Sequence, residues 1–272
     1  MPVIPVASTA DPLLADYALL REPARLRARG AFVAEGRFVV RRLVEGERFA
    51  VRSLLVTETA HAALADLAPR LVAVPVLVGS KALAREVTGF SFHQGCLAIG
   101  ERGAEERDVA RWLEALGPGA RTIVALENVS HADNVGAVFR NAAAFGADGV
   151  LLDGGTADPL YREAVRVSMA ATLRVPFARP SRLAEAIGTL AEAGFRVAAL
   201  TPRPSAIELG ELGARVARDH RLAFLVGSEG EGLSDAALAL ADLELRIPMA
   251  EGVDSLNLAA ATAIALYERS RR

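Results

Sequence analysis

The sequence contains few cysteines, aromatic residues and lysines, and each shortage excludes a class of protein or limits its core. Cys96 is the only cysteine among 272 residues, which excludes a disulfide within the chain and a metal site built from a cysteine cluster. A single thiol suits the reducing cytoplasm, where we expect this protein to be. Aromatic residues make up 5% of the chain and Lys81 is the sole lysine. The core must therefore be mainly aliphatic, and the surface cations are mainly arginines.

Long apolar runs and a strong net charge are also lacking. No run approaches the roughly 18 to 20 residues that a membrane helix needs, and the first 17 residues lack the basic and unbroken apolar regions of a signal peptide. The formal net charge of −2 excludes a surface that is positive throughout, but a local basic face could still bind nucleic acid. The preference for arginine fits a biased genome composition as well as bidentate phosphate binding. With 52% hydrophobic and 24% charged residues, the chain can form a folded core.

Expected strands and helices alternate in the first hundred residues. The pattern predicts, in order, a charged helical segment at 12–29, a strand at 49–57, a helix at 61–71, a strand at 72–78 and a helix at 80–89. This alternation indicates a small α/β domain over residues 20–102. A polar stretch then predicts a linker and a leading helix over residues 103–120.

The same alternation is stronger in the remaining residues, 121–272. Apolar runs predict strands at 122–126, 149–153, 195–200, 222–226 and 243–248, and helical spacing predicts helices at 134–145, 160–170, 181–193 and 256–269. Nearly continuous apolar strands separated by helices indicate a parallel sheet covered on both faces. Ligands of such sheets bind beyond the carboxyl ends of the strands, so polar residues that follow the strands are candidate site residues.

The first such loop has the sequence ENVSHADNVGAVFR. Asn134 stands where the N-cap of the next helix is expected, and Arg140 lies six residues further along. Gly136 would allow the backbone to approach a ligand closely. A capping asparagine followed by a solvated arginine explains the pattern equally well.

The second loop has the sequence GSEGEGLS. It lacks the Gly-Lys-Ser/Thr ending of a P-loop and the Gly-x-Gly-x-x-Gly spacing of a dinucleotide site. Glu229 lies between glycines, where a carboxylate opposes phosphate but suits a hydroxyl, an amine or a cationic sulfonium. The alternative is that Glu229 caps a helix starting near Leu233.

The third loop has the sequence IPMAEGVDSLN. Ser255 is placed to cap the last helix. Asn257 is then expected in the first helical turn, where asparagine contributes little to helix stability. A functional role therefore explains Asn257 better than a structural one.

Taken in order, Asn-x-Gly-Ala-x-x-Arg, Gly-Ser-Glu-Gly-x-Gly and Ile-Pro-Met…Ser-Leu-Asn resemble the three motifs of the SpoU (TrmH) family, which belongs to the knotted SPOUT methyltransferases. The resemblance implies an RNA ribose 2'-O-methyltransferase that uses S-adenosylmethionine and no metal. It also implies a deep trefoil knot in the parallel sheet. By motif position, the catalytic residues are Asn134, Arg140, Glu229, Ser255 and Asn257. Those that surround the methyl donor are Thr201, Gly227, Ile247, Met249 and Leu256.

The resemblance leaves the role of Arg140 open. It could act as the base for the 2'-hydroxyl, although a guanidinium stays protonated under ordinary conditions. It could instead hold the adjacent phosphate and stabilise developing charge. Enzymes of this kind are usually homodimers through the knotted domain, and the apolar faces of the helices at 134–145 and 256–269 are candidates for that interface.

The first region resembles another domain type. FVAEGRFVVRRLVE and FHQGCLAIGER resemble parts of the small ribosomal-protein-like substrate-binding domain that is often fused to SpoU enzymes. The resemblance implies RNA contacts by residues that include the arginine group at 21–29, Arg37, Arg41, Arg42, His93 and, beside the first motif, His131. Each arginine could equally belong to a solvated helix face. Because the extra domain suggests a folded target, ribosomal RNA is the first expectation and transfer RNA the alternative.

Two other classes compete with this interpretation. A knotted RNA-binding protein without activity is expected to have lost Arg140 or Asn257, but both are present. A dinucleotide-binding oxidoreductase needs a glycine fingerprint after its first strand, and the chain does not have one.

Overall fold

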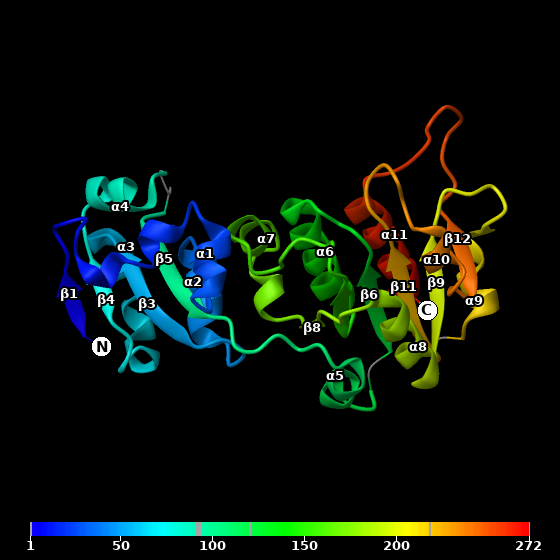
Figure 1. Ribbon diagram of the computed structural model, residues 1–272, viewed down its shortest axis with the longest axis horizontal. Helices are drawn as coiled ribbons and strands as arrows, with labels where there is room; N and C mark the ends of the chain where they lie inside the picture. Colours follow the sequence, from blue (N-terminus) through cyan, green and yellow to red (C-terminus); the bar gives the residue numbers. More distant parts are fainter. Residues whose placement is uncertain (1, 91–93, 120, 218, 272) are drawn as a thin grey trace. The chain divides into compact units, whose positions relative to one another are not determined.

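The computed structural model describes residues 2–90, 94–119, 121–217 and 219–271, which form two compact units (Figure 1). The N-terminal unit comprises Met1–Ala104 together with Pro159–Arg174. The C-terminal unit comprises Glu105–Asp158 together with Val175–Arg272. This division differs from the predicted one, which began the first domain at residue 20 and placed residues 159–174 in the second.

The N-terminal unit is built on a mixed sheet. Its strands within the described residues are β1 (Val3–Pro5), β2 (Ala31–Glu35), β3 (Val51–Val56), β4 (Val76–Val78) and β5 (Cys96–Glu101), in the order β1-β4-β3-β5-β2. The strands β1, β4 and β3 are parallel, whereas β5 is antiparallel to β3 and β2. Its α-helices are α1 (Pro23–Ala28), α2 (Arg37–Glu45), α3 (Glu58–Ala63), α4 (Lys81–Thr88) and α7 (Arg162–Val167).

The helical segment predicted at 12–29 is three short helices instead of one. They are η1 (Pro12–Leu14), η2 (Tyr17–Leu19) and α1. Pro12 and Pro23 each begin a helix, because proline fits the first helical turn but disrupts a helix interior. The helix predicted at 61–71 is likewise divided, into α3 and η3 (Ala65–Arg70), which contains Pro69.

Packing explains why residues 159–174 belong to the N-terminal unit. Helix α7 packs against β2, and the Arg162 guanidinium forms an ion pair with Glu35 at 2.7 Å. The helix predicted at 160–170 is shorter than expected: it ends at Val167 and is followed by the 3-10 helix η4 (Ala171–Leu173). Met169 and Ala170 adopt positive φ values of 51° and 65°, which a regular helix does not allow.

The C-terminal unit is built on a sheet that is parallel throughout. Its strands within the described residues are β6 (Thr122–Leu126), β7 (Gly149–Leu152), β8 (Phe177–Ala178), β9 (Phe195–Leu200), β10 (Ile207–Glu208), β11 (Arg221–Val226) and β12 (Leu243–Arg246), in the order β10-β12-β9-β11-β6-β7-β8. The expectation of an α/β fold with a parallel sheet is confirmed. The two-residue strands β8 and β10 were not predicted.

Helices cover both faces of this sheet. They are α5 (Val109–Leu116), α6 (Ala132–Phe145), α8 (Leu183–Glu192), α9 (Leu212–Arg215), α10 (Asp235–Leu238) and α11 (Leu258–Ser270), with the 3-10 helix η5 (Leu209–Glu211). On one face, α5 and α8 enclose a core that includes Trp112, Ile123 and Leu225. Because strand side chains alternate, Val124 and Leu152 point to the opposite face. Helices α6 and α11 pack side by side (Figure 1).

The strand order decides where a site can form. Because β11 lies between β9 and β6 and all strands are parallel, the carboxyl ends of β6, β11, β9 and β12 form one continuous edge. Within the described residues, no helix is long and apolar enough to cross a membrane.

Candidate active site

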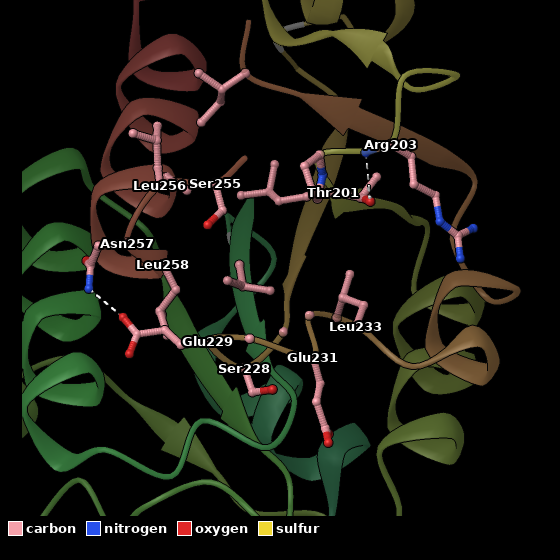
Figure 2. Close-up of a pocket in the computed structure, with 18 of the residues that line it drawn as sticks. Thr201, Arg203, Ser228, Glu229, Glu231, Leu233, Ser255, Leu256, Asn257 and Leu258 are labelled. Atoms are coloured by element: carbon pink, nitrogen blue, oxygen red, sulfur yellow. Dashed lines mark hydrogen bonds between the residues drawn. The ribbon is translucent and has the colours of Figure 1, made fainter. Parts of the chain in front are cut away.

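A cavity of about 550 Å³ lies beyond the carboxyl ends of β9, β11 and β12 (Figure 2). The residues that line it are 200–203, 226–233 and 255–258, together with Leu238, Leu245, Ile247, Met249 and Ala261. The second and third predicted motifs therefore meet around one space. Figure 2 shows Ser255 and Leu256 on one side of it, and Thr201 and Arg203 on the other.

All five residues predicted to surround the donor line this cavity: Thr201, Gly227, Ile247, Met249 and Leu256. The backbone N–H of Thr201 donates to the carbonyl of Leu245 at 2.9 Å, which joins the end of β9 to β12. The lining combines aliphatic side chains with polar and charged ones. Sites for small organic ligands have this composition.

The loop 227–233 closes on itself. The backbone N–H of Gly232 donates to the carbonyl of Ser228 at 3.1 Å, and a side chain at Gly227 would overlap the backbone of Gly232. Gly230 and Gly232 have φ values of +93° and +72°, which glycine adopts without strain. These glycines therefore allow a tight loop, and no phosphate is needed to explain them.

Glu127 holds both ends of this loop. Its backbone N–H donates to the carbonyl of Val226 at 2.9 Å. Its carboxylate accepts the backbone N–H of Ser234 at 2.8 Å and the Ser234 hydroxyl at 2.7 Å. Sequence reasoning missed Glu127, because the contact joins residues 107 positions apart. The only available signal was an acidic residue directly after β6.

Asn257 connects the three motifs. It is the N-cap of α11, and its Oδ1 accepts the backbone N–H groups of Ala259 and Ala260 at 3.0 and 3.2 Å. Its Nδ2 donates to Glu229 Oε1 at 2.6 Å and to Asn134 Oδ1 at 3.1 Å; the first of these bonds is drawn in Figure 2. One predicted site residue from each motif thus takes part in a single hydrogen-bonded cluster.

This cluster corrects three sequence-based expectations. Asn257, and not Ser255, caps the last helix. Asn134 lies in the first turn of α6, whose N-cap is His131. Glu229 caps no helix, since Ser234 is the N-cap of α10. A shift of two to five residues in the position of the N-cap separates each expectation from the structure.

Arg140 is not brought into this cavity. It is exposed on α6 and does not line the cavity. Six residues separate it from Asn134, which corresponds to a rotation of about 240° around a helix. One chain therefore does not bring Arg140 to the side of α6 on which Asn134 contacts Asn257.

Arg203 was not predicted, although it follows β9 and lines the cavity. Its guanidinium lies 2.9 Å from Asp235 and 3.7 Å from Glu244. The rule that selected the other loops, polar residues after a strand end, applies to it equally. Within the described residues, no group of three or more His, Cys, Asp or Glu side chains is arranged to hold a metal ion.

The predicted RNA contacts in the N-terminal unit differ in their surroundings. Arg41 is paired with Asp66, and this hydrogen bond raises the pKa of Arg41 and lowers that of the Asp66 carboxyl. Arg42 lies over the exposed ring of Phe38, 5.2 Å from its centroid. The backbone N–H of Arg37 donates to Gln94 at 2.8 Å. His93 lies outside the described residues.

Comparison with known proteins shows the family of this chain. Residues 121–267 match the model of the SpoU rRNA Methylase family. Over 271 residues, the chain is 42% identical to proteins of Mycobacterium bovis and Mycobacterium tuberculosis that are named uncharacterized tRNA/rRNA methyltransferases, and the match covers 98% of this chain and 91% of each relative. The chain belongs to the SpoU family.

Solved structures of related proteins also match nearly the whole chain. An rRNA methyltransferase from Sinorhizobium meliloti with bound AdoMet (S-adenosylmethionine) has a TM-score of 0.83 and 27% identity, and the match covers 99% of this chain and 98% of that one. An RNA 2'-O ribose methyltransferase has a TM-score of 0.74 and 25% identity, with the same coverage. These two solved structures therefore share the fold of this chain over nearly its whole length.

Proposed function

We propose that this SpoU-family protein transfers a methyl group from S-adenosylmethionine to a ribose 2'-hydroxyl of RNA, with ribosomal RNA as the first candidate. One observation carries the proposal: a single cavity is lined by every residue expected around the donor, and it adjoins the cluster formed by Asn134, Glu229 and Asn257. The AdoMet-bound relative and the ribose methyltransferase relative support the donor and the position of the methyl group.

The cavity fits the donor in size and chemistry. Its volume of about 550 Å³ lies within the range of roughly 300 to 1,000 Å³ for small-molecule sites. Leu245, Ile247 and Leu256 would cover an adenine ring, while backbone groups of the surrounding loops meet its polar edge. The Glu229 carboxylate at the rim suits a positively charged sulfonium.

The reaction requires alignment more than acid–base chemistry. When bound, S-adenosylmethionine supplies a methyl group on a sulfonium that leaves as a neutral thioether. The ribose 2'-oxygen forms the new C–O bond as the C–S bond breaks, and the hydroxyl proton passes to a base or to water. Held by Asn257, Glu229 would orient the ribose, with Ser255 at the cavity wall as a further hydroxyl contact. Such positioning can supply much of the rate.

Arg140 fits this scheme as a residue contributed by a second copy of the chain. We propose a homodimer through the C-terminal unit, in which Arg140 of one subunit completes the site of the other. Exposed apolar side chains on α11, Ile264 and Tyr267, support such an interface. Once there, the guanidinium could hold the RNA phosphate next to the reacting ribose or act as the base.

Mixed dimers test this arrangement. An Arg140→Ala chain and an Asn257→Ala chain are each expected to be inactive alone. If Arg140 acts across the interface, co-expressed chains form mixed dimers with one intact site, and activity returns to about a quarter of the wild-type level for random assembly. Absence of any recovery would show that both residues act within one chain.

The deep trefoil knot is also part of the proposal. It is supported by the insertion of β11 between β9 and β6, by the pairing of β12 with β9, and by the return of α11 to α6. We further propose that the enzyme works in the cytoplasm, where ribosomal and transfer RNA are made, and that the reaction needs no metal.

Mapping 2'-O-methyl groups in total RNA tests the function directly. We expect a strain that lacks the gene to lose one 2'-O-methyl group from ribosomal RNA, and to regain it from the wild-type gene but not from an Asn257→Ala copy. Loss from transfer RNA instead would support the alternative substrate. An unchanged pattern in both RNA classes would contradict the proposal.

A further inference from the structure

The N-terminal unit contains a second cavity, of about 430 Å³, that none of the three loop motifs of the C-terminal unit lines. It lies among β2, α1, the end of α4 and the start of α7. Four arginines and a single carboxylate, Glu163, are among the described residues that line it, in a chain whose formal net charge is −2. The arginines are Arg21, Arg27, Arg102 and Arg162, and the aromatic residues are Phe32, Phe90 and Tyr161.

Two of the guanidinium groups are held in place. The Arg162 guanidinium lies over the ring of Phe90, 4.1 Å from its centroid, and is paired with the mostly buried Glu35 at 2.7 Å. The Arg21 guanidinium packs against Gly89, where any side chain would overlap it. Gly89 also ends α4 with a φ of +74°. Packing therefore fixes the positions of Arg21 and Arg162 in the wall of the cavity, so these two guanidinium groups are not freely solvated.

The arginine and aromatic side chains of this cavity together indicate one class of ligand. Guanidinium groups match the charge and geometry of phosphate oxygens, and aromatic faces stack on nucleobases. A nucleotide supplies both partners, whereas an acidic peptide supplies only the charge. Phe90 and Tyr161 are half-buried and still accessible from the cavity, whereas Phe32 is buried in its wall.

We propose that this cavity binds one nucleotide of the single-stranded part of the RNA substrate, with the phosphate at the arginines and the base against Tyr161. This inference rests on the proposed function and extends it by naming a substrate contact outside the catalytic cavity. Residues 160–163, which pack in the N-terminal unit, complete the wall that β2 and α1 begin.

Binding of the full-length protein to a fluorescein-labelled 12-nucleotide RNA of mixed sequence, followed by fluorescence anisotropy, tests the inference. Arg27→Ala should make the dependence of log K on log salt shallower by roughly 0.7, the loss of one phosphate contact on a single strand. Arg25→Ala is the matched control, because Arg25 is on the same helix, is exposed, pairs with Glu22 and does not line the cavity. It should leave the slope unchanged.

Two substitutions of Tyr161 test base stacking. Tyr161→Ala should weaken RNA binding by roughly 5- to 100-fold, as loss of a base–aromatic stack does. Tyr161→Phe keeps the ring and should restore the affinity to within about twofold. Arg162 is left unchanged, because its loss would leave the Glu35 carboxylate without its cation.

The inference is overturned if Arg27→Ala and Arg25→Ala behave alike, or if Tyr161→Ala binds the RNA as tightly as wild type. Methyl transfer measured in parallel separates this result from failure of the proposed function. If the enzyme transfers methyl groups but its RNA affinity is unchanged by these substitutions, the nucleotide site alone is refuted. RNA binding that depends on them, without any methyl transfer, refutes the proposed activity alone.

Discussion

The two units are both α/β, yet their sheets bring side chains together in different ways. In the C-terminal unit every strand pair is parallel, so the loops after β9, β11 and β12 gather at one edge around one cavity. In the N-terminal unit β5 runs against β2 and β3, and the basic cavity is built from segments between residues 20 and 163. A parallel sheet turns consecutive sequence motifs into one site, whereas a mixed sheet does not.

Replacement of Arg140 should have the largest effect on the rate of methyl transfer. It tests whether the cavity residues of the C-terminal unit are sufficient for the reaction without Arg140. Arg140→Ala should lower the rate of methyl transfer by about 100- to 1,000-fold, as removal of a charge-stabilising group does. Donor affinity measured by calorimetry should not change, because Arg140 does not line the cavity. Arg215→Ala, another exposed arginine of this unit, is the control. Nearly wild-type methylation by Arg140→Ala would remove Arg140 from the site.

Asn257→Ser separates the structural role of this residue from its role in the site. Serine can still cap α11 but lacks the Nδ2 donor that reaches Glu229 and Asn134. We expect a rate about 100-fold lower with a melting temperature close to wild type. Asn257→Ala should also destabilise the protein by about 1 kcal/mol. A fully active serine variant would show that capping alone explains Asn257.

Glu127→Ala tests how far the donor cavity depends on the loop that Glu127 holds. Without the carboxylate, Ser234 loses two hydrogen bonds, and we expect the dissociation constant for S-adenosylmethionine to rise about tenfold, which corresponds to about 1.4 kcal/mol. Asp108→Ala is the matched control: it removes the N-cap of α5 in the same unit, at a similar cost in stability, and should leave donor affinity unchanged. Equal affinities in both variants would contradict the role of Glu127.

Alkaline pH should produce the smallest effect, and only in the N-terminal unit. Burial raises the pKa of the Cys96 thiol to about 12 and also raises the pKa of Tyr17. Between about pH 8.5 and 10 the unfolded chain therefore loses protons that the folded unit keeps, so stability falls as the pH rises. The reactivity of Cys96 toward a thiol reagent reports this unit, and the fluorescence of Trp112, the sole tryptophan, reports the other. If the unfolding curves followed by the two probes shifted equally as the pH rises, the expected difference in pH dependence between the two units would be contradicted.

The same comparison explains what the sequence could predict. Strands β6, β9 and β11 are mainly apolar, so their ends could be located from the sequence although β9 contains Arg196. Gly227 and Thr201 were assigned to the donor by motif position, and both line the cavity. Residues at helix starts were not placed correctly, because a shift of two positions exchanges the roles of Ser255 and Asn257. Such shifts depend on hydrogen bonds across the fold.

Contacts between distant segments account for the other differences. The pair of Arg162 and Glu35 joins positions 127 apart, and it draws residues 159–174 into the N-terminal unit. The pair of Glu127 and Ser234 is of the same kind. Neither contact leaves a pattern in the local sequence from which it could be predicted. The basic cavity of the N-terminal unit depends on several such contacts, which is why the sequence could name the arginine group at 21–29 as RNA contacts or as a solvated helix face, but could not place Arg21 and Arg27 in a cavity.

Methylation of RNA by the purified protein tests the central claim most directly. Ribosomal and transfer RNA from cells that lack the gene are incubated with the protein and S-adenosylmethionine, digested to nucleosides and analysed by mass spectrometry. The account predicts one new 2'-O-methylnucleoside with the wild-type protein and none with Asn257→Ala. A methyl group on a base, or no methylated nucleoside with either RNA, would contradict it.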